Sequence, residues 1–317
     1  MSTMNQFIQK IENANTIAIL GHIRPDGDCV GSCLGLYNYI NDNYADKSVV
    51  VYLQPIPDKF TFLRGAKSIK NEPDDNIYDL AVSLDCGDRF RHGEFACVYS
   101  AAKDTICLDH HRSNDGFGDY YYCDPDASSA CEILYRHIDQ TKISTYCAEA
   151  LYLGIVHDTG VFKYSCTSEE TMQIAGHLLT LGARSQYIID ETFYKVNFNQ
   201  NKLTGLALTD ARLHLEGKVI STCVTTDMFK KCNATKDDTD GIVDKIRVTD
   251  GVEVAIFAYQ TGEDTYKISL RSVAYVDVSK IAVTYGGGGH IRAAGFEVKG
   301  NYEDNLNNIL DMIREQL

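Results

Sequence analysis

The stretch Thr16-Ile-Ala-Ile-Leu-Gly-His-Ile-Arg-Pro-Asp-Gly-Asp-Cys-Val-Gly-Ser32 decides the expected fold of the N-terminal half of the chain. Its first five residues predict a short buried strand, and the small and apolar residues that follow up to position 40 predict a helix. Pro25 and Gly27 keep the connection between the two out of regular structure. This connection carries three side chains of the kind that bind metal ions: His22, Asp26 and Asp28. Because such side chains are poorly placed for a hydrophobic core, we expect a metal site after the strand.

Short apolar runs and helical stretches alternate beyond this segment. Strands are predicted at residues 49–53, 80–84 and 105–108, and helices at residues 128–138, 145–156 and 168–181. This alternation is typical of an α/β fold with a mostly parallel sheet flanked by helices. Polar residues follow the predicted strand and helix ends, namely Asp85, then Asp109, His110 and His111, and then Asp158. Because ligands bind outside the carboxyl ends of parallel strands, we expect these residues to form one site.

The C-terminal part of the chain has a different pattern. Strands are predicted at residues 218–224, 253–259 and 265–270, with a hairpin loop at 260–264, and helices at residues 238–248, 278–285 and 303–316. We expect a first domain over residues 1–185, a connection over residues 186–205, and a smaller α/β domain over residues 206–317. The active site is expected in the cleft between the two domains.

The composition is that of a globular protein, and the charge narrows its partners. Of the 317 residues, 44% are hydrophobic and 23% charged, with a formal net charge of -14. This acidity argues against binding of long duplex nucleic acid, which depends on lysine and arginine. Bound divalent cations would still admit short phosphorylated substrates. The 11 cysteines form no CxxC pair, and no signal peptide or membrane-spanning run is visible, so we expect a cytoplasmic protein without membrane contact.

Seven candidate ligands form a carboxylate-rich set that contains imidazoles and no cysteine: His22, Asp26, Asp28, Asp85, Asp109, His110 and Asp158. Such a set suits manganese, magnesium or iron better than structural zinc. Seven ligands are too many for one ion, whereas two divalent ions about 3.5–4 Å apart would use them, with Asp85 shared between the ions. An isolated aspartate after a strand is more often a helix cap or turn residue, and this is the interpretation of Asp88 or Asp109 taken alone.

Four consecutive glycines, Gly286 to Gly289, precede His290 in the C-terminal part. They are either a flexible loop or a place where the main chain approaches a ligand closely. Peptide N–H groups there would hold a phosphate, and His290 would add a donor. Arg271, at the end of a predicted strand, would reach either an anionic group or an acidic neighbour.

The motifs together resemble those of the DHH phosphoesterases that carry a DHHA1 C-terminal domain, and within them the NrnA-type nanoRNase/pAp phosphatases. The resemblance spans nearly the whole chain. It is carried by five pieces of sequence: His22-Ile-Arg-Pro-Asp-Gly-Asp28 with Gly31-Ser32, Asp85-Cys-Gly-Asp-Arg89, Asp109-His-His111, Asp158-Thr-Gly-Val-Phe162, and Gly286-Gly-Gly-Gly-His290 with Ala293-Ala-Gly295.

The resemblance implies a role for each matching residue. One ion would be held by His22, Asp26 and Asp85, and the other by Asp28, Asp85, His110 and Asp158. Asp109 would orient the histidines and His111 would contact the phosphoryl group, so that Asp85, Asp109 and His111 are the catalytic residues. The substrate would be held from the second domain by Arg271, Gly288, Gly289 and His290.

The resemblance also implies an activity. Such enzymes use two divalent ions, here expected to be Mn²⁺, and a hydroxide attacks phosphorus. They release 5′-mononucleotides from very short oligoribonucleotides, and many convert pAp to AMP. A homodimer is expected from the same resemblance. The chain departs from the usual pattern at His157, where threonine is common, at Cys29, where alanine is usual, and at Ala130-Cys131. We expect His157 to point away from the metals.

Three other functions remain open at this point. The same scaffold serves cyclic dinucleotide or linear pApA phosphodiesterases. An inorganic pyrophosphatase shares the N-terminal motifs, although its second domain lacks the Gly-Gly-Gly-His pattern. A nucleotide-binding module without catalysis would be expected to lack ligands, whereas every expected ligand is present in this chain.

Overall fold

The computed structural model describes residues 3–317 and divides into two compact units, with the boundary between Lys195 and Val196. Met1 and Ser2 lie outside the described residues. The prediction that the chain carries no signal peptide falls partly on these two residues. Each unit has its own sheet and its own hydrophobic cores.

Unit 1, residues up to Lys195, is built on five parallel strands in the order β2-β1-β3-β4-β5. The strands are β1 (Thr16–Leu20), β2 (Ser48–Tyr52), β3 (Leu80–Leu84), β4 (Thr105–Asp109) and β5 (Tyr120–Cys123). Ile17 and Ile19 of β1 face one hydrophobic core, whereas Ala18 and Leu20 face another. The sheet is therefore buried on both sides, as expected of a parallel sheet.

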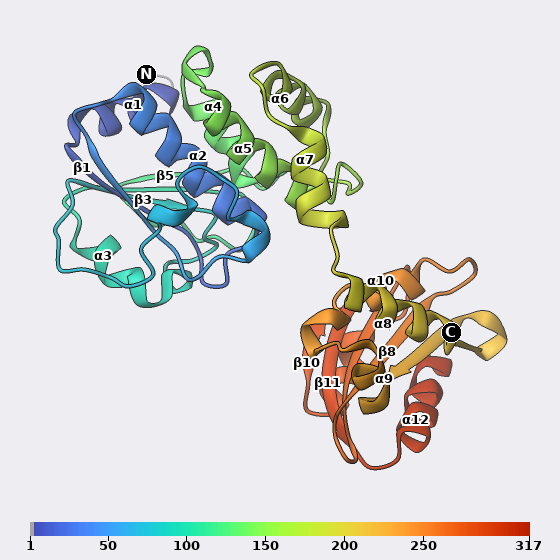
Figure 1. Ribbon diagram of the computed structural model, residues 1–317. Helices are drawn as coiled ribbons and strands as arrows, with labels where there is room; N and C mark the ends of the chain where they lie inside the picture. The colour runs from blue at the N-terminus through green and yellow to red at the C-terminus, as the bar shows by residue number, and fades with distance from the viewer. Residues whose placement is uncertain (1–2) are drawn as a thin grey trace. The chain divides into compact units, whose positions relative to one another are not determined.

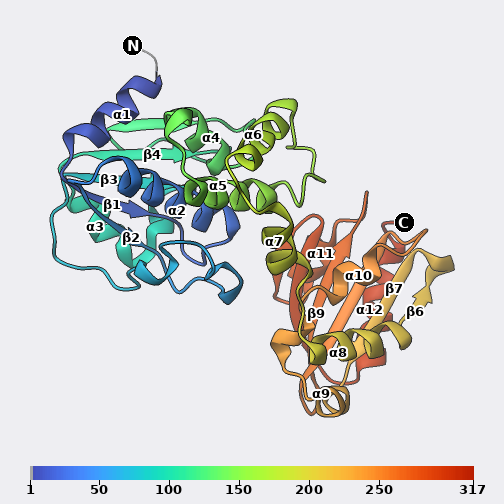
Figure 2. The same cartoon turned by 45° about the horizontal axis from the view of Figure 1, so that its top comes forward.

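Helices cover both faces of this sheet. They are α1 (Thr3–Asn13), α2 (Gly27–Asn43), α3 (Ala96–Ala101), α4 (Ala130–His137), α5 (Thr145–Asp158), α6 (Glu169–Thr180) and α7 (Ser185–Ile189). Helices α1, α2, α4 and α5 lie on one side of the sheet and α3 on the other (Figure 1). Figure 2 shows β4, β3, β1 and β2 side by side in that order.

Helices α2 and α5 pack closely because glycines stand at their contact. A Cβ at Gly31 would lie 2.5 Å from the carbonyl oxygen of Ala150, and one at Gly154 would lie 2.6 Å from Oδ1 of Asp28. No larger residue fits at either position without moving a helix. This close crossing brings the start of α2 next to the end of α5, where Asp28 and Asp158 are found.

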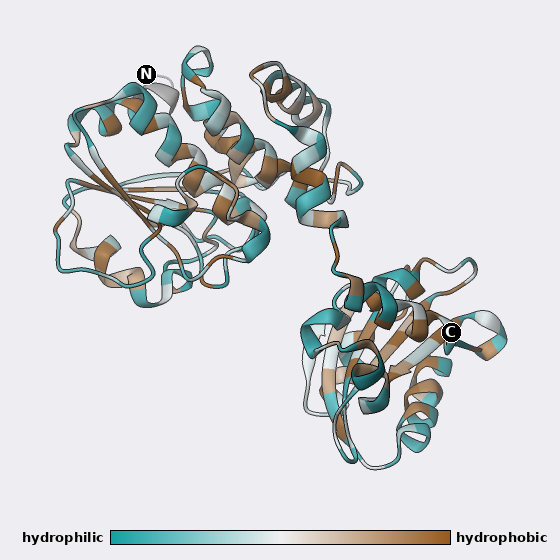
Figure 3. Cartoon of the chain, in the orientation of Figure 1, coloured by the Kyte–Doolittle hydropathy of each residue, from teal (hydrophilic) through white to brown (hydrophobic). Residues whose placement is uncertain are grey.

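Unit 2, from Val196 onward, holds a six-stranded mixed sheet in the order β10-β11-β9-β8-β7-β6, in which only β7 and β8 are parallel. The strands are β6 (Arg212–His214), β7 (Val219–Val224), β8 (Val254–Gly262), β9 (Thr265–Ser272), β10 (Gly288–His290) and β11 (Ala293–Lys299). The helices are α8 (Phe198–Thr209), α9 (Thr226–Cys232), α10 (Ile242–Arg247), α11 (Val278–Thr284) and α12 (Tyr302–Arg314). In Figure 3 the hydrophobic residues of each unit concentrate in its strands and along one side of its helices.

The α/β class, the parallel N-terminal sheet and the smaller C-terminal domain are confirmed. Ser168 caps α6 and forms a reciprocal capping box with Thr171. The predicted loop at 260–264 is wrong in length, because β8 and β9 extend to Gly262 and Thr265 and leave two residues between them. Strand β5 escaped prediction, since four residues at a sheet edge carry too little periodicity. Residues 186–205 contain the end of α7, a π-helical turn (Asp190–Tyr194) and the start of α8.

Candidate metal centre

The site lies at the carboxyl ends of β1, β3 and β4 in unit 1. The structure brings together the six residues that the family resemblance implies as metal ligands: His22, Asp26, Asp28, Asp85, His110 and Asp158. Groups of three among the nearby side chains place one ligand atom each within 4.8 Å of one another. A set of this kind is suited to holding a cation.

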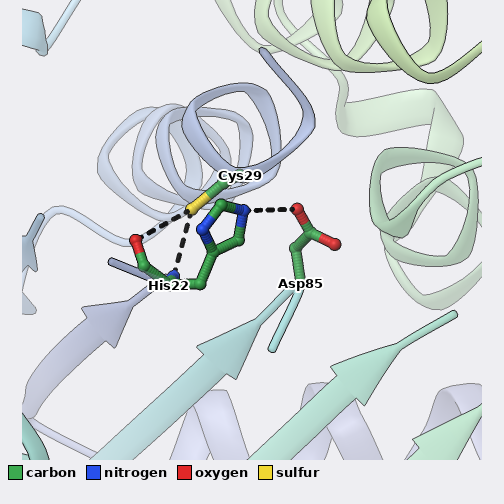
Figure 4. Close-up of side chains that lie close together, drawn as sticks. All are labelled: His22, Cys29 and Asp85. Carbon is green, nitrogen blue, oxygen red and sulfur yellow. Dashed lines mark hydrogen bonds and ion pairs between the residues drawn. The ribbon is translucent and has the colours of Figure 1, made fainter. Parts of the chain in front are cut away.

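His22 is held in the orientation of a metal ligand. Its Nδ1 lies 2.8 Å from the carbonyl oxygen of Ile23, which only accepts, so in the neutral ring that binds a metal ion Nδ1 carries the proton and Nε2 keeps its lone pair. Nε2 lies 3.4 Å from Oδ2 of Asp85, as Figure 4 shows, and 3.7 Å from Oδ1 of Asp26. Burial acts to lower the pKa of His22, but the two carboxylates outweigh it and raise the pKa far above its usual value. The position between these carboxylates therefore favours a cation.

Asp85 follows β3 and faces both halves of the site. Its φ of 57° is left-handed, a conformation that aspartate tolerates better than most residues, and the side chain is buried. Oδ2 faces His22, whereas Oδ1 lies 3.5 Å from Nε2 of His110. Oδ1 is buried and has no hydrogen-bond partner among the described residues. A buried carboxylate oxygen without a donor is costly, and a metal ion bound there would remove the cost.

His110 lies close to the two remaining carboxylates, those of Asp28 and Asp158. Its Nε2 lies 3.2 Å from Oδ2 of Asp158 and 3.9 Å from Oδ2 of Asp28. Burial acts to lower the pKa of His110, but the attraction of the Asp158 and Asp85 carboxylates outweighs it and raises the pKa to about 12. Burial, together with the charge of neighbouring carboxylates, raises the pKa of both Asp28 and Asp158. Crowded carboxylates with raised pKa values indicate a place where a positive ion would relieve repulsion.

The two aspartates of the first loop are fixed by backbone donors. Oδ1 of Asp26 caps α2 by accepting from the N–H groups of Asp28 and Cys29, at 3.1 Å each. Asp28 is fully buried and accepts from the N–H groups of Ala130 and Cys131 at the start of α4, at 2.6 and 3.0 Å. Because these bonds come from the backbone, the unusual side chains at 130 and 131 leave the Asp28 anchor intact.

Asp109 supports the site without facing the ion-binding groups directly. Its Oδ1 accepts from Nδ1 of His111 at 2.8 Å and its Oδ2 accepts from Nδ2 of Asn114 at 2.6 Å. The pKa of His111 is raised, mainly by the bond to Asp109. His111 is 41% exposed, so its ring can reach a ligand in solvent. Asn114 was missed in the sequence, and its only signal is its place in the loop that follows Asp-His-His.

Asp88 is a helix cap, as the simpler interpretation predicts. Its Oδ1 accepts from the N–H groups of Phe90 and Arg91 at 2.8 and 3.1 Å. The same interpretation of Asp109 as a cap is wrong, because both oxygens bind side chains of the site.

Two of the unusual residues have structural roles. The ring of His157 packs against Phe60 and Phe193, with ring centroids 5.0 and 4.5 Å away, rather than joining the carboxylates. Sγ of Cys29 accepts from the backbone N–H of His22 at 3.2 Å and lies near its carbonyl oxygen (Figure 4). Burial raises the pKa of the Cys29 thiol well above its usual value, which makes it a poor metal ligand despite its position.

The predicted substrate residues lie together in unit 2. In the sheet, His290 of β10 pairs with Ala293 of β11, which pairs with Arg271 of β9. Gly288, Gly289 and His290 are exposed, and Nη1 of Arg271 donates to the carbonyl of Leu270 at 3.1 Å. Arg271 forms no ion pair with an acidic side chain in the described part of the chain, so its charge is available to a ligand.

Two glycines of the run are required by packing. A Cβ at Gly289, whose φ is 147°, would lie 2.5 Å from Cα of Ala294, and one at Gly287 would lie 2.9 Å from Cα of Phe296. A Cβ at Gly288 would meet nothing within 4 Å. Packing against β11 therefore accounts for Gly287 and Gly289, and Gly288 leaves open space above the backbone.

The parallel sheet and the carboxylate and imidazole side chains at its edge are typical of a metal-dependent hydrolase. Comparison with known sequences identifies the family. Residues 16–155 match the N-terminal domain of the DHH family, and residues 217–317 match the DHHA1 domain. The chain belongs to the DHH family and is a phosphoesterase, a hydrolase of phosphoric esters.

Its relatives narrow the class further. The chain is 30% identical over 302 residues, 93% of each chain, to the probable bifunctional oligoribonuclease and PAP phosphatase NrnA of Streptococcus mutans. It is 28% identical over 298 residues, 92% of each chain, to the bifunctional oligoribonuclease and PAP phosphatase NrnA of Bacillus subtilis. A solved structure of an exopolyphosphatase-related protein from Bacteroides fragilis aligns with a TM-score of 0.83 at 26% identity, covering 99% of this chain and 96% of that one. Among the described helices, none combines the length and apolar character that a membrane span requires.

Proposed function

We propose that the chain is a phosphodiesterase that hydrolyses very short oligoribonucleotides to 5′-mononucleotides with two divalent ions, and that it also converts pAp to AMP. The observation that carries the proposal is the position of Asp85, whose two oxygens face two different histidines. A single carboxylate in this position would bridge two ions. The oligoribonuclease and PAP phosphatase relatives, which align over nearly the whole chain, support the substrate class.

The residues fit two hard or borderline divalent cations. His22, Asp26 and Asp85 would hold one ion, and Asp28, Asp85, His110 and Asp158 the other. All these donors are oxygen or imidazole nitrogen, which suits Mn²⁺ or Mg²⁺, and the mixture with imidazole favours Mn²⁺. Two such ions would supply hydroxide at neutral pH and neutralise charge on a phosphodiester.

Other residues of the chain position the substrate. His111, fixed by Asp109 and half-exposed, would donate to a phosphoryl oxygen as negative charge develops there. In unit 2, Arg271 and His290 would bind the far phosphate or sugar, and the open space over Gly288 would let the ligand approach the backbone. Because these groups act as donors to an anion, we expect their loss to raise KM more than it lowers kcat.

The test is a side-by-side assay with Mn²⁺ of diadenylate, pAp, pApA, cyclic diadenylate and pyrophosphate, with chromatography of the products. We expect diadenylate and pAp to be cleaved, AMP to be released, and EDTA to abolish the reaction. Asp85→Asn is expected to lose at least about 1,000-fold in kcat, whereas Asp126→Asn, a matched change at an exposed ion pair with Arg112, should keep full activity.

Each of the other possible results of this assay would indicate a different function. Full Mn²⁺-dependent activity of Asp85→Asn would overturn the metal assignment. Preferred cleavage of cyclic diadenylate or pApA would identify a cyclic dinucleotide pathway enzyme, and preferred cleavage of pyrophosphate would identify a pyrophosphatase. No turnover of any of these substrates would leave a binding module.

A further inference from the structure

Two hollows adjoin each other on unit 1 and share one wall. The smaller has a volume of about 380 Å³ and is lined in part by Asp88 and Asn114. The larger has a volume of about 650 Å³ and is lined in part by His92 and Tyr99. Four residues line both hollows and are here called the shared wall: Arg89, Phe90, Phe117 and Gly118. Cavities of a few hundred Å³ are of the size that takes small ligands.

The smaller hollow is joined to the metal centre by hydrogen bonds. Asn114 on its lining donates to Asp109, which in turn holds His111. The N–H of Ile23, directly after His22, donates to the carbonyl of Arg91 at 2.7 Å. The two segments that carry the shared wall, residues 89–90 and 117–118, are therefore each fixed to the metal centre by a hydrogen bond close to them in sequence.

The larger hollow is aromatic. The rings of Tyr99 and Phe117 meet edge to face with centroids 5.7 Å apart, and the ring of His92 lies 4.8 Å from Tyr99. Nε2 of His92 is engaged with the hydroxyl of Ser83 at 2.7 Å. These packed rings line the larger hollow, and Phe117 is the one among them that belongs to the shared wall.

Phe90 is the unusual member of this wall. Its side chain is 81% exposed although its backbone is held by the Asp88 cap. The guanidinium of Arg89 lies 5.8 Å from the Phe90 ring centroid, and Arg89 forms no ion pair among residues 6–317. An exposed ring beside an unpaired cation, in a chain with a net charge of -14, matches a flat ligand that carries negative charge. A nucleotide has both features.

We propose that the shared wall is a nucleobase subsite for the substrate, in which a base stacks on Phe90 while Arg89 pairs with a phosphate. The inference deepens the proposed function and rests on it. Because every base presents an aromatic face, stacking here would tolerate all four bases and would give short oligonucleotides an affinity that an isolated phosphate lacks. The subsite belongs to unit 1 and is separate from the Arg271 and His290 groups of unit 2.

The experiment compares diadenylate with two analogues, one lacking the 5′ base and one lacking the 3′ base. With the wild-type chain and Mn²⁺, we expect one analogue to show kcat/KM lowered roughly 10-fold, mainly through KM, which also identifies the base that stacks. In Phe90→Ala the preference for diadenylate over that analogue should fall towards 1, and Phe90→Trp should restore it. Tyr146→Ala is the matched control, because Tyr146 is a half-exposed aromatic about 18 Å along α5 from Asp158.

Equilibrium binding of a phosphorothioate-linked diadenylate, measured by calorimetry, separates this inference from the proposed function. If the wild type hydrolyses diadenylate but Phe90→Ala keeps the full preference over both analogues, the subsite is wrong and the function stands. If nothing is hydrolysed but the phosphorothioate binds, and binds about 10-fold more weakly to Phe90→Ala, the subsite stands and the function is wrong. Absence of both turnover and binding overturns both, and a loss that is equal for diadenylate and both analogues overturns the stacking role.

Discussion

Replacing Asp85 with asparagine should remove most of the stability that divalent metal gives to unit 1. The substitution keeps the shape of the side chain and removes its charge. Because Oδ2 faces His22 and Oδ1 faces His110, this one change reaches both halves of the site. Asp158→Asn reaches only the half that contains His110. The two variants therefore differ in the number of ions that they weaken.

The size of the effect follows from mass action. An ion present at 100 times its Kd stabilises the folded state by about 2.7 kcal/mol, and a 100-fold loss of affinity leaves about 0.4 kcal/mol. The loss is then about 2.3 kcal/mol for each ion affected. For a unit of this size each kcal/mol is worth about 2–4 °C, so the metal-induced rise in Tm should shrink by roughly 5–9 °C in Asp158→Asn and by about twice that in Asp85→Asn.

The assay is calorimetry of each variant in EDTA and in 1 mM MnCl₂, with the difference taken within each variant. This difference cancels any change that the substitution causes in the metal-free protein. Asp126→Asn should show the wild-type shift. Equal losses in Asp85→Asn and Asp158→Asn would refute the bridging position of Asp85, and a full shift in Asp85→Asn would refute its role as a ligand.

Three further predictions concern packing, pH and the substrate strand. Gly154→Ala should destabilise the protein by about 1–3 kcal/mol because its Cβ would overlap side chains across the helix contact, whereas Gly176→Ala on α6, where the Cβ meets nothing, should stabilise it by about 0.4–1 kcal/mol. Burial lowers the pKa of His157 to about 4, so below pH 6.5 the unfolded chain takes up a proton that the folded chain does not, and the wild type loses stability. His157→Phe lacks this titration and should be more stable than the wild type at pH 5 by about 2 kcal/mol. Gly288→Ala should keep the wild-type Tm but raise KM, whereas Gly289→Ala should lower the Tm because its Cβ would overlap β11.

Urea unfolding measures the first two predictions. The packing argument fails if the alanines at 154 and 176 change stability in the same direction. The pH argument fails if His157→Phe and the wild type lose stability in parallel between pH 7 and pH 5. For the substrate strand, KM for diadenylate and Tm are measured on both variants, and an unchanged KM in Gly288→Ala would contradict the predicted contact.

The grouping of the proposed metal ligands was predictable from sequence because strand ends in a parallel sheet share one edge. Asp85 and His110 each follow an apolar run, and topology alone brings such positions together. The left-handed conformation of Asp85 was not predictable, because aspartate adopts it only under the constraints of the surrounding fold. The same limit explains why Asn114 was missed: a loop amide becomes informative only when its carboxylate partner has been placed.

Unit 2 shows a different limit. The glycine run predicts either a flexible loop or a close approach of main chain to a ligand, and the sequence does not decide between them. Gly287 and Gly289 approach β11 of the same sheet, whereas a Cβ at Gly286 or Gly288 would meet nothing within 4 Å, and of these two only Gly286 has a left-handed φ, of 72°. The alignment of His290 with Arg271 depends on the register of three strands, two of which are far apart in sequence. Register of this kind follows from tertiary packing rather than from local pattern.

Gly27 has a role that the sequence did not suggest. The sequence predicts that Gly27 keeps the connection between strand and helix out of regular structure, whereas Gly27 is the first residue of α2. Asp26 caps α2 and Asp28 is its second residue, and the two side chains are held by different backbone donors. The space beside Gly27 is instead filled by the ring of His157, which a Cβ would overlap. Because His157 precedes Asp158 on α5, the missing side chain at 27 is what lets the end of α5 pack against the start of α2 and present Asp158 to His110. Gly27, which is not a proposed metal ligand, thus determines whether Asp158 can reach the side of the site that contains His110.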